Sequence, residues 1–67
     1  MINKVVGYRK MLSMTQKEMA DKLGLSEGQY RAKEKGRYDF SREEMKKFHS
    51  IVNQKLTDVG IMDIFFN

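Results

Sequence analysis

The sequence predicts an all-α fold, a compact bundle of four to five helices, and three features of the chain support this prediction. No segment alternates strictly between polar residues and the β-branched residues that are typical of a strand. Apolar residues instead recur three and four positions apart, which places them on one face of a helix. Ser or Thr at positions 15, 26 and 41 is followed three residues later by Glu or Gln, and this capping-box pattern marks three helix starts.

The N-terminal half is predicted to hold three helices. The inward face of the first consists of Ile2, Val5, Val6, Arg9 and Leu12. The inward face of the second, expected over 15–23, consists of Met19, Ala20 and Leu23. The third helix is expected over 26–35, and its only large apolar group after Leu25 is Tyr30, so most of its surface is expected to be exposed.

The C-terminal half begins with the capping box of Ser41 and Glu44, which opens a fourth helix. The inward face of this helix consists of Met45, Phe48, Ile51 and Val52. After Lys55 the chain turns, and residues 61–66 are predicted to form a last short helix or an apolar tail.

Residues 15–36 are the most informative segment of the chain. Gly24 stands where the second helix must end, because glycine alone adopts the left-handed cap conformation without steric cost. The corner of Gly24, Leu25 and Ser26 is short enough to force a sharp crossing of the two flanking helices. This is the pattern of a helix-turn-helix, a unit that places its second helix in the major groove of DNA.

Length and composition narrow the classes of function. The 67 residues suffice for a single domain, 1–67, with one modest core and no room for a buried substrate cleft. The chain has no Cys, no apolar run near the roughly 18 residues of a membrane span and no signal-peptide pattern, which favours a cytoplasmic protein. Lys and Arg number 13 against 9 Asp and Glu, and the resulting net charge of +4 suits a polyanionic partner.

Catalysis and metal binding are not expected. The sequence shows no nucleophile paired with a base and no glycine-rich phosphate loop. The lone His49 has no Cys, His or acidic partner at ligand spacing, so we interpret it as a packing residue. We therefore expect no enzyme activity, no cofactor, no metal and no small-molecule ligand.

From about Val5 to Phe66 the chain resembles helix-turn-helix domains of the Cro/cI (XRE) class, the phage-repressor type. The matching residues are Arg9, Thr15-Gln16, Met19-Ala20, Leu23-Gly24-Leu25-Ser26, Tyr30, Glu34-x-Gly36 and the Asp-Ile-Phe-Phe sequence at 63–66. The resemblance implies a five-helix fold of the lambda-repressor type, sequence-specific binding of double-stranded DNA by the third helix, and control of transcription in a phage, prophage or mobile element.

The resemblance and the helical positions together identify candidate site residues. The candidates for reading base edges are Glu27, Gly28, Gln29, Arg31 and Ala32. The candidates for binding phosphates are Gln16, Ser26, Lys35, Arg37, Tyr38 and Arg42. Gly28 and Ala32 depart from the family, which places long polar readers there, so base readout is expected to be sparse. The resemblance further implies a partly buried structural ion pair between Arg9 and Glu34, and the amine of Lys33 is expected in water.

The sequence thus favours a homodimeric repressor of a phage or mobile-element promoter, bound to a double-stranded DNA operator. Two alternatives share this fold. One is an antitoxin or immunity-type regulator whose main partner is a protein, and the other is a helix-turn-helix relic that makes only protein contacts. Exposure of Met62 and Phe66 would favour a dimer or a protein partner, whereas full burial would favour completion of the monomer core.

Overall fold

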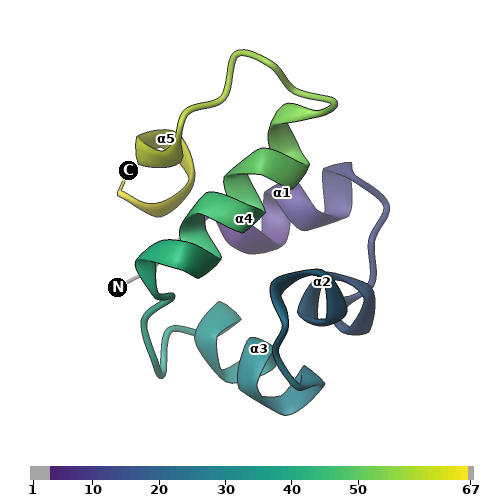
Figure 1. Cartoon of the computed structure of the whole chain (residues 1–67), viewed down its shortest axis with the longest axis vertical. Coiled ribbons are helices and arrows are strands. Elements are labelled where there is room, and N and C mark those ends of the chain that lie inside the picture. The colour runs from purple at the N-terminus through teal and green to yellow at the C-terminus, as the bar shows by residue number, and fades with distance from the viewer. Residues whose placement is uncertain (1–3, 67) are drawn as a thin grey trace.

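The computed structural model describes residues 4–66 and contains, within this range, five helices and no strand (Figure 1). The helices are α1 (Val5–Met11), α2 (Gln16–Leu23), α3 (Glu27–Glu34), α4 (Arg42–Asn53) and α5 (Ile61–Phe65). The all-α prediction is confirmed. Among the described residues, no helix has the length and apolar character needed to cross a membrane. Ile2, expected on the inward face of the first helix, lies outside this range.

The three helix starts predicted from capping boxes are confirmed. The hydroxyls of Thr15, Ser26 and Ser41 accept the backbone N–H three residues later, at N···O distances of 3.1, 3.1 and 3.2 Å respectively. The side chain of that later residue accepts the N–H of the cap in return, at 2.8 to 3.0 Å. Each box satisfies two backbone donors that have no partner within the helix.

One core joins all five helices. Its buried apolar residues are Val5, Leu12, Met19, Ala20, Leu23, Tyr30, Phe40, Phe48, Val52, Ile64 and Phe65. Within it, Phe40 contacts Tyr30 and Phe65 edge to face, with ring centroids 6.0 and 5.5 Å apart, and Phe48 contacts Phe65 at 5.7 Å. Such T-shaped pairs are the favoured geometry of aromatic rings. The long helix α4 crosses the centre of the molecule, as Figure 1 shows, and provides Phe48 and Val52 to this core.

The C-terminal segment forms a helix and completes the core in part. Ile64 and Phe65 are buried, and the carbonyl of Ile64 accepts the backbone N–H of Lys4 at 3.0 Å, which joins α5 to the start of α1. Met62 and Phe66 instead remain 66% and 51% exposed. Helix α5 and its cap Phe66 therefore have one face in the core and one face open to solvent.

His49 lies on α4 and is half-buried. Its Nε2 atom lies 2.8 Å from the carbonyl oxygen of Val59, in the loop that leads to α5. A hydrogen bond at this distance fixes the loop against α4, which gives this histidine a structural role.

Candidate nucleic-acid interface

The helix-turn-helix geometry arises from a short corner between α2 and α3. Gly24 has a φ of 75°, the left-handed conformation that the sequence predicted for it. The N–H of Leu25 then bonds to the carbonyl of Ala20 at 2.9 Å, which closes the end of α2. Because Ser26 already caps α3, the two helices are separated by only three residues and cross sharply (Figure 1).

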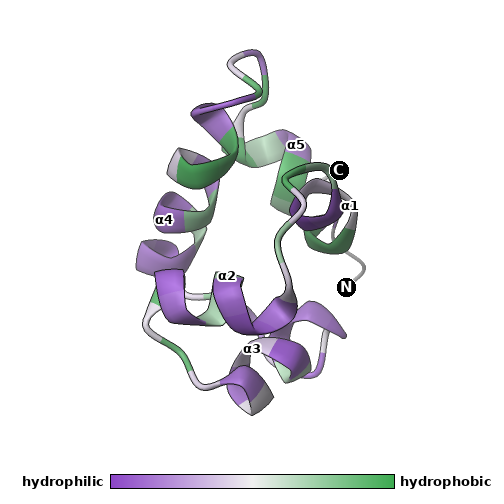
Figure 2. Cartoon of the chain, turned by 90° about the vertical axis from the view of Figure 1, so that its right-hand side faces the viewer, coloured by the Kyte–Doolittle hydropathy of each residue, from purple (hydrophilic) through white to green (hydrophobic). Residues whose placement is uncertain are grey.

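The outer surface of α3 is polar and open to solvent. Tyr30 is its one fully buried residue, with no exposed area, and is the residue that fixes α3 on the core. Figure 2 shows that α2 and α3 are mostly hydrophilic, whereas α5 and one side of α4 are hydrophobic. The base-reading candidates Glu27, Gly28, Gln29 and Arg31 are exposed and Ala32 is half-buried. The outer face of α3 is therefore open to solvent, and an α-helix fits into the major groove of DNA.

Two of these candidates bind each other. Arg31 Nη2 lies 3.0 Å from Glu27 Oε2, one turn apart on α3, and the two side chains are 49% and 44% exposed. Gln29 is also partly engaged, because its Oε1 accepts the N–H of Ser26 in the capping box. The two long charged side chains expected to read bases are thus held together at the surface of α3.

Gln16, the first residue of α2, is half-buried. Its Nε2 donates to Glu34 Oε1 at 2.8 Å, and its Oε1 accepts from Arg31 Nε at 3.3 Å. The amide thus links a buried carboxylate to the Arg31 side chain on the α3 surface. The phosphate contact expected for Gln16 stays a prediction, but in the free protein the amide is bound within the chain.

Arg9 and Glu34 form the ion pair that the resemblance implied. Arg9 Nε lies 2.8 Å from Glu34 Oε2, and the side chains are only 10% and 4% exposed. The carboxylate also accepts the hydroxyl of Tyr30 at 2.7 Å, while Arg9 Nη1 donates to the carbonyl of Met14 at 2.9 Å. Together with Gln16, these contacts join α1, α2 and α3 around one carboxylate, which we call the Glu34 network.

The pKa values of the Glu34 network follow from its burial and its hydrogen bonds. Burial by itself would raise the pKa of Glu34, but hydrogen bonds from Arg9, Tyr30 and Gln16 outweigh it and hold the pKa below its ordinary value. The hydrogen bond to Glu34 raises the pKa of Arg9, and burial raises the pKa of Tyr30. All three groups therefore keep their neutral-pH charge states when the protein folds.

Four of the phosphate-binding candidates follow α3 in the chain, whereas Ser26 lies at its start. Lys35, Arg37, Tyr38 and Arg42 are exposed, and the hydroxyl of Ser26 serves as the cap of α3. A hollow of about 210 Å³ lies on this side of the helix. Its lining, which defines what we call the α3 hollow, consists of Gly28, Arg31, Ala32, Lys35 and Arg37. Three cations and two small residues from the candidate sets are thus adjacent in the folded chain.

Lys33 differs from its expected placement. Its amine is not free in water, because Nζ lies 2.6 Å from Glu44 Oε1 and the two side chains are 18% and 15% exposed. The same carboxylate oxygen closes the capping box of Ser41. Burial alone would raise the pKa of Glu44, but the Lys33 and Ser41 hydrogen bonds lower it. Lys33 therefore joins α3 to α4, and this contact was not found by sequence reasoning.

Comparison with known proteins agrees with this geometry. A family model described as helix-turn-helix matches residues 8–59, which include α2, α3 and their corner. The chain is also 36% identical over 63 residues to a protein of Methanocaldococcus jannaschii that is described as an uncharacterized HTH-type transcriptional regulator. That alignment covers 94% of this chain and 96% of the relative.

Proposed function

Because this chain belongs to the XRE-type helix-turn-helix family, we propose that it is a sequence-specific regulator of transcription that reads double-stranded DNA in the major groove with α3. The regulated site in this proposal is a promoter of a phage or mobile element, and the regulator acts on it as a repressor. A DNA partner implies a cytoplasmic location. No catalytic step, metal or cofactor is part of this function.

The observation that carries the proposal is the exposed outer face of α3 beside a group of cations. Any surface helix exposes a polar face, but on α3 this face adjoins three cations, Arg31, Lys35 and Arg37, that the structure brings together. Cations in such positions contact backbone phosphates and set the register of a helix in the groove, while side chains on the helix face contact base edges. The net charge of +4 adds a long-range attraction to the polyanion.

The ion pair between Glu27 and Arg31 does not oppose base reading. An exposed pair one helical turn apart contributes only about 0.3–0.5 kcal/mol, whereas a bidentate contact to the correct base discriminates by about 1–3 kcal/mol. The interaction free energy of Arg31 therefore becomes more favourable when it leaves Glu27 and contacts a guanine edge. Glu27, which is repelled by phosphates, is stabilised at the interface only where it accepts a cytosine amino group, so it increases specificity more than affinity.

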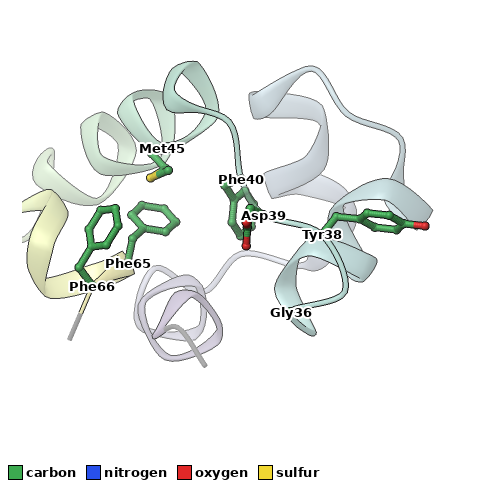
Figure 3. A pocket seen from close by; sticks show the side chains of 7 residues that line it. All are labelled: Gly36, Tyr38, Asp39, Phe40, Met45, Phe65 and Phe66. Carbon is green, nitrogen blue, oxygen red and sulfur yellow. The ribbon is translucent and has the colours of Figure 1, made fainter. Parts of the chain in front are cut away.

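Dimerisation is the second part of the proposal, and the exposed apolar residues near the C-terminus support it. Met62 and Phe66 are large side chains that are more than half exposed. Figure 3 shows the Phe66 ring beside that of Phe65, with Met45 near both. These three residues help to line a hollow of about 250 Å³. A second copy that covers this surface would pair two α3 helices for two DNA half-sites, which multiplies the affinity of a single one.

The same exposed apolar residues favour one alternative function. A regulator of the antitoxin or immunity type would use Met62 and Phe66 to bind a protein of a different sequence. In that case α3 would play a minor part, and a second copy of this chain would not compete for the surface.

The proposal is tested by selecting bound duplexes from a random-sequence pool at near-physiological salt and sequencing them. An enriched inverted repeat, with half-site centres about one helical turn apart, is expected for a dimeric reader of operators. A single short half-site would retain DNA reading and remove the dimer. Binding without enrichment, lost as salt rises, would leave only electrostatic affinity and favour the protein-partner alternative.

A further inference from the structure

We propose that the α3 hollow recognises thymine through its C5 methyl group, with Gly28 and Ala32 as the specificity-determining residues. This inference rests on the proposed function and specifies the base chemistry that the interface reads. It is carried by the two lining residues without a polar side chain, by the presence of glycine at position 28, and by the three cations in the lining.

Two of the five residues that line the α3 hollow, Gly28 and Ala32, have no hydrogen-bonding side chain. Gly28 and Ala32 are one helical turn apart, so they share one face of α3. A polar base edge held against them would lose hydrogen bonds to water without replacement, which is unfavourable. In the major groove, the thymine C5 methyl is the apolar group that base pairs present. The surface of Gly28 and Ala32 therefore favours thymine over the other three bases.

Nothing among residues 4–66 requires glycine at position 28. The residue lies within the helical span of α3, and a Cβ added to it would have no atom within 4 Å. Glycine also lowers helix stability relative to alanine. The fold itself would therefore favour alanine, and the absence of a side chain is useful only where a molecule outside the chain approaches the backbone closely.

The other three residues that line the α3 hollow are the cations Arg31, Lys35 and Arg37. Among residues 4–66, Lys35 and Arg37 form no ion pair, so their charges are available to phosphates. Arg31 is held by hydrogen bonds to Glu27 and Gln16. With these cations on backbone phosphates, a base edge can approach Gly28 and Ala32, the two lining residues that have no long side chain.

The test uses the operator recovered from the random pool and replaces each thymine in turn by deoxyuridine, which removes the methyl group alone. Binding is measured by fluorescence anisotropy. We expect one thymine in each half-site whose replacement raises the Kd about fourfold, the effect of losing one buried methyl group. Gly28→Ala, which narrows the hollow, should weaken binding to the thymine operator and reduce the deoxyuridine effect to less than about twofold.

Gly7→Ala is the matched control. Gly7 is also an exposed glycine in the first turn of a helix, with no atom within 4 Å of an added Cβ, and it is not part of the α3 hollow. Both variants should raise the midpoint of thermal unfolding, but Gly7→Ala should leave DNA binding and the deoxyuridine effect unchanged.

Each other outcome overturns the inference in an identifiable way. If an operator is recovered but no thymine is sensitive to deoxyuridine, the proposed function stands and methyl recognition is wrong. If the sensitivity persists in Gly28→Ala, another part of the protein contacts the methyl group. If no sequence is enriched, the proposed function fails and the inference fails with it.

Discussion

The substitution Glu34→Gln is the most severe test of how this fold is held together. It keeps the size of the side chain but removes the charge that neutralises Arg9. The carboxylate accepts two bonds from Arg9, at 2.8 and 3.4 Å, and one each from Gln16 and Tyr30, at 2.8 and 2.7 Å. An amide retains one oxygen, so at least part of the Glu34 network must lose its acceptor.

The expected loss of stability follows from burial. Removing one partner of a buried ion pair costs about 3–5 kcal/mol, because the other charge stays desolvated. The Glu34 side chain is only 4% exposed, which places this pair in that class. A domain of this length has a free energy of unfolding of roughly 3–10 kcal/mol, so the variant should lose a large fraction of it. The midpoint of thermal unfolding should fall by about 12 °C or more.

Urea unfolding followed by circular dichroism at neutral pH measures this loss. Glu27→Gln is the control, since it breaks an ion pair whose side chains are 44% and 49% exposed and should cost less than about 1 kcal/mol. If Glu34→Gln lowered the free energy of unfolding no more than Glu27→Gln does, the Glu34 network would not be what holds α1, α2 and α3 together.

Three further predictions concern pH, DNA contacts and assembly. The pKa of Glu34 is lowered on folding, so its contribution is complete above its ordinary value of 4.5 and is lost as the pH falls through the folded-state pKa. Urea unfolding at a series of acid pH values should therefore show that acid lowers the free energy of unfolding less in Glu34→Gln than in the wild type. Equal decreases in the two proteins would contradict this. Arg31→Ala should relax specificity at one base pair, by about 1–3 kcal/mol. Lys35→Ala should instead weaken binding to all sequences alike and reduce by about one the slope of log affinity against log salt concentration. Unchanged DNA affinity in both variants would exclude docking by α3. Met62→Lys and Phe66→Ser should shift the protein toward monomer in analytical ultracentrifugation without loss of helical circular dichroism, and an unchanged sedimentation coefficient would remove these residues from a dimer interface.

The helix starts and the α2–α3 corner could be predicted from the sequence because their causes are local. Each capping box depends on two residues three positions apart, and the end of α2 depends on the single left-handed residue Gly24. By contrast, Ser13 also has a positive φ, 57°, at the end of α1. Serine gives no signal for this conformation, so that turn was not predictable.

The burial of Phe40 was missed although the sequence carried a signal for it. Phe40 immediately precedes the cap Ser41, and Met45 is the fourth residue of the helix that follows. An apolar residue at each of these positions is the hydrophobic-staple pattern, which predicts that the loop residue packs inward. In the structure Phe40 lies between Tyr30 and Phe65 and joins α3 to α5 through the core.

The orientation of the side chains at the candidate interface was not predictable from sequence. Gln16 binds Glu34, 18 residues away, and Lys33 binds Glu44, 11 residues away, because the helices that carry them pack together. Spacing along one helix does identify Glu27 and Arg31 as neighbours, as an i and i+4 pair. The helix face that is free could thus be predicted, whereas the bonds that preorganise it depend on tertiary packing.

The central claim, that α3 enters the major groove, is tested most directly by a titration of ¹⁵N-labelled protein with the selected operator duplex. Amide chemical shifts report contacts residue by residue on the intact chain. We expect the largest changes on residues 27–32 and at the first turn of α2. Changes confined to residues 61–66, with α3 unaffected, would contradict it.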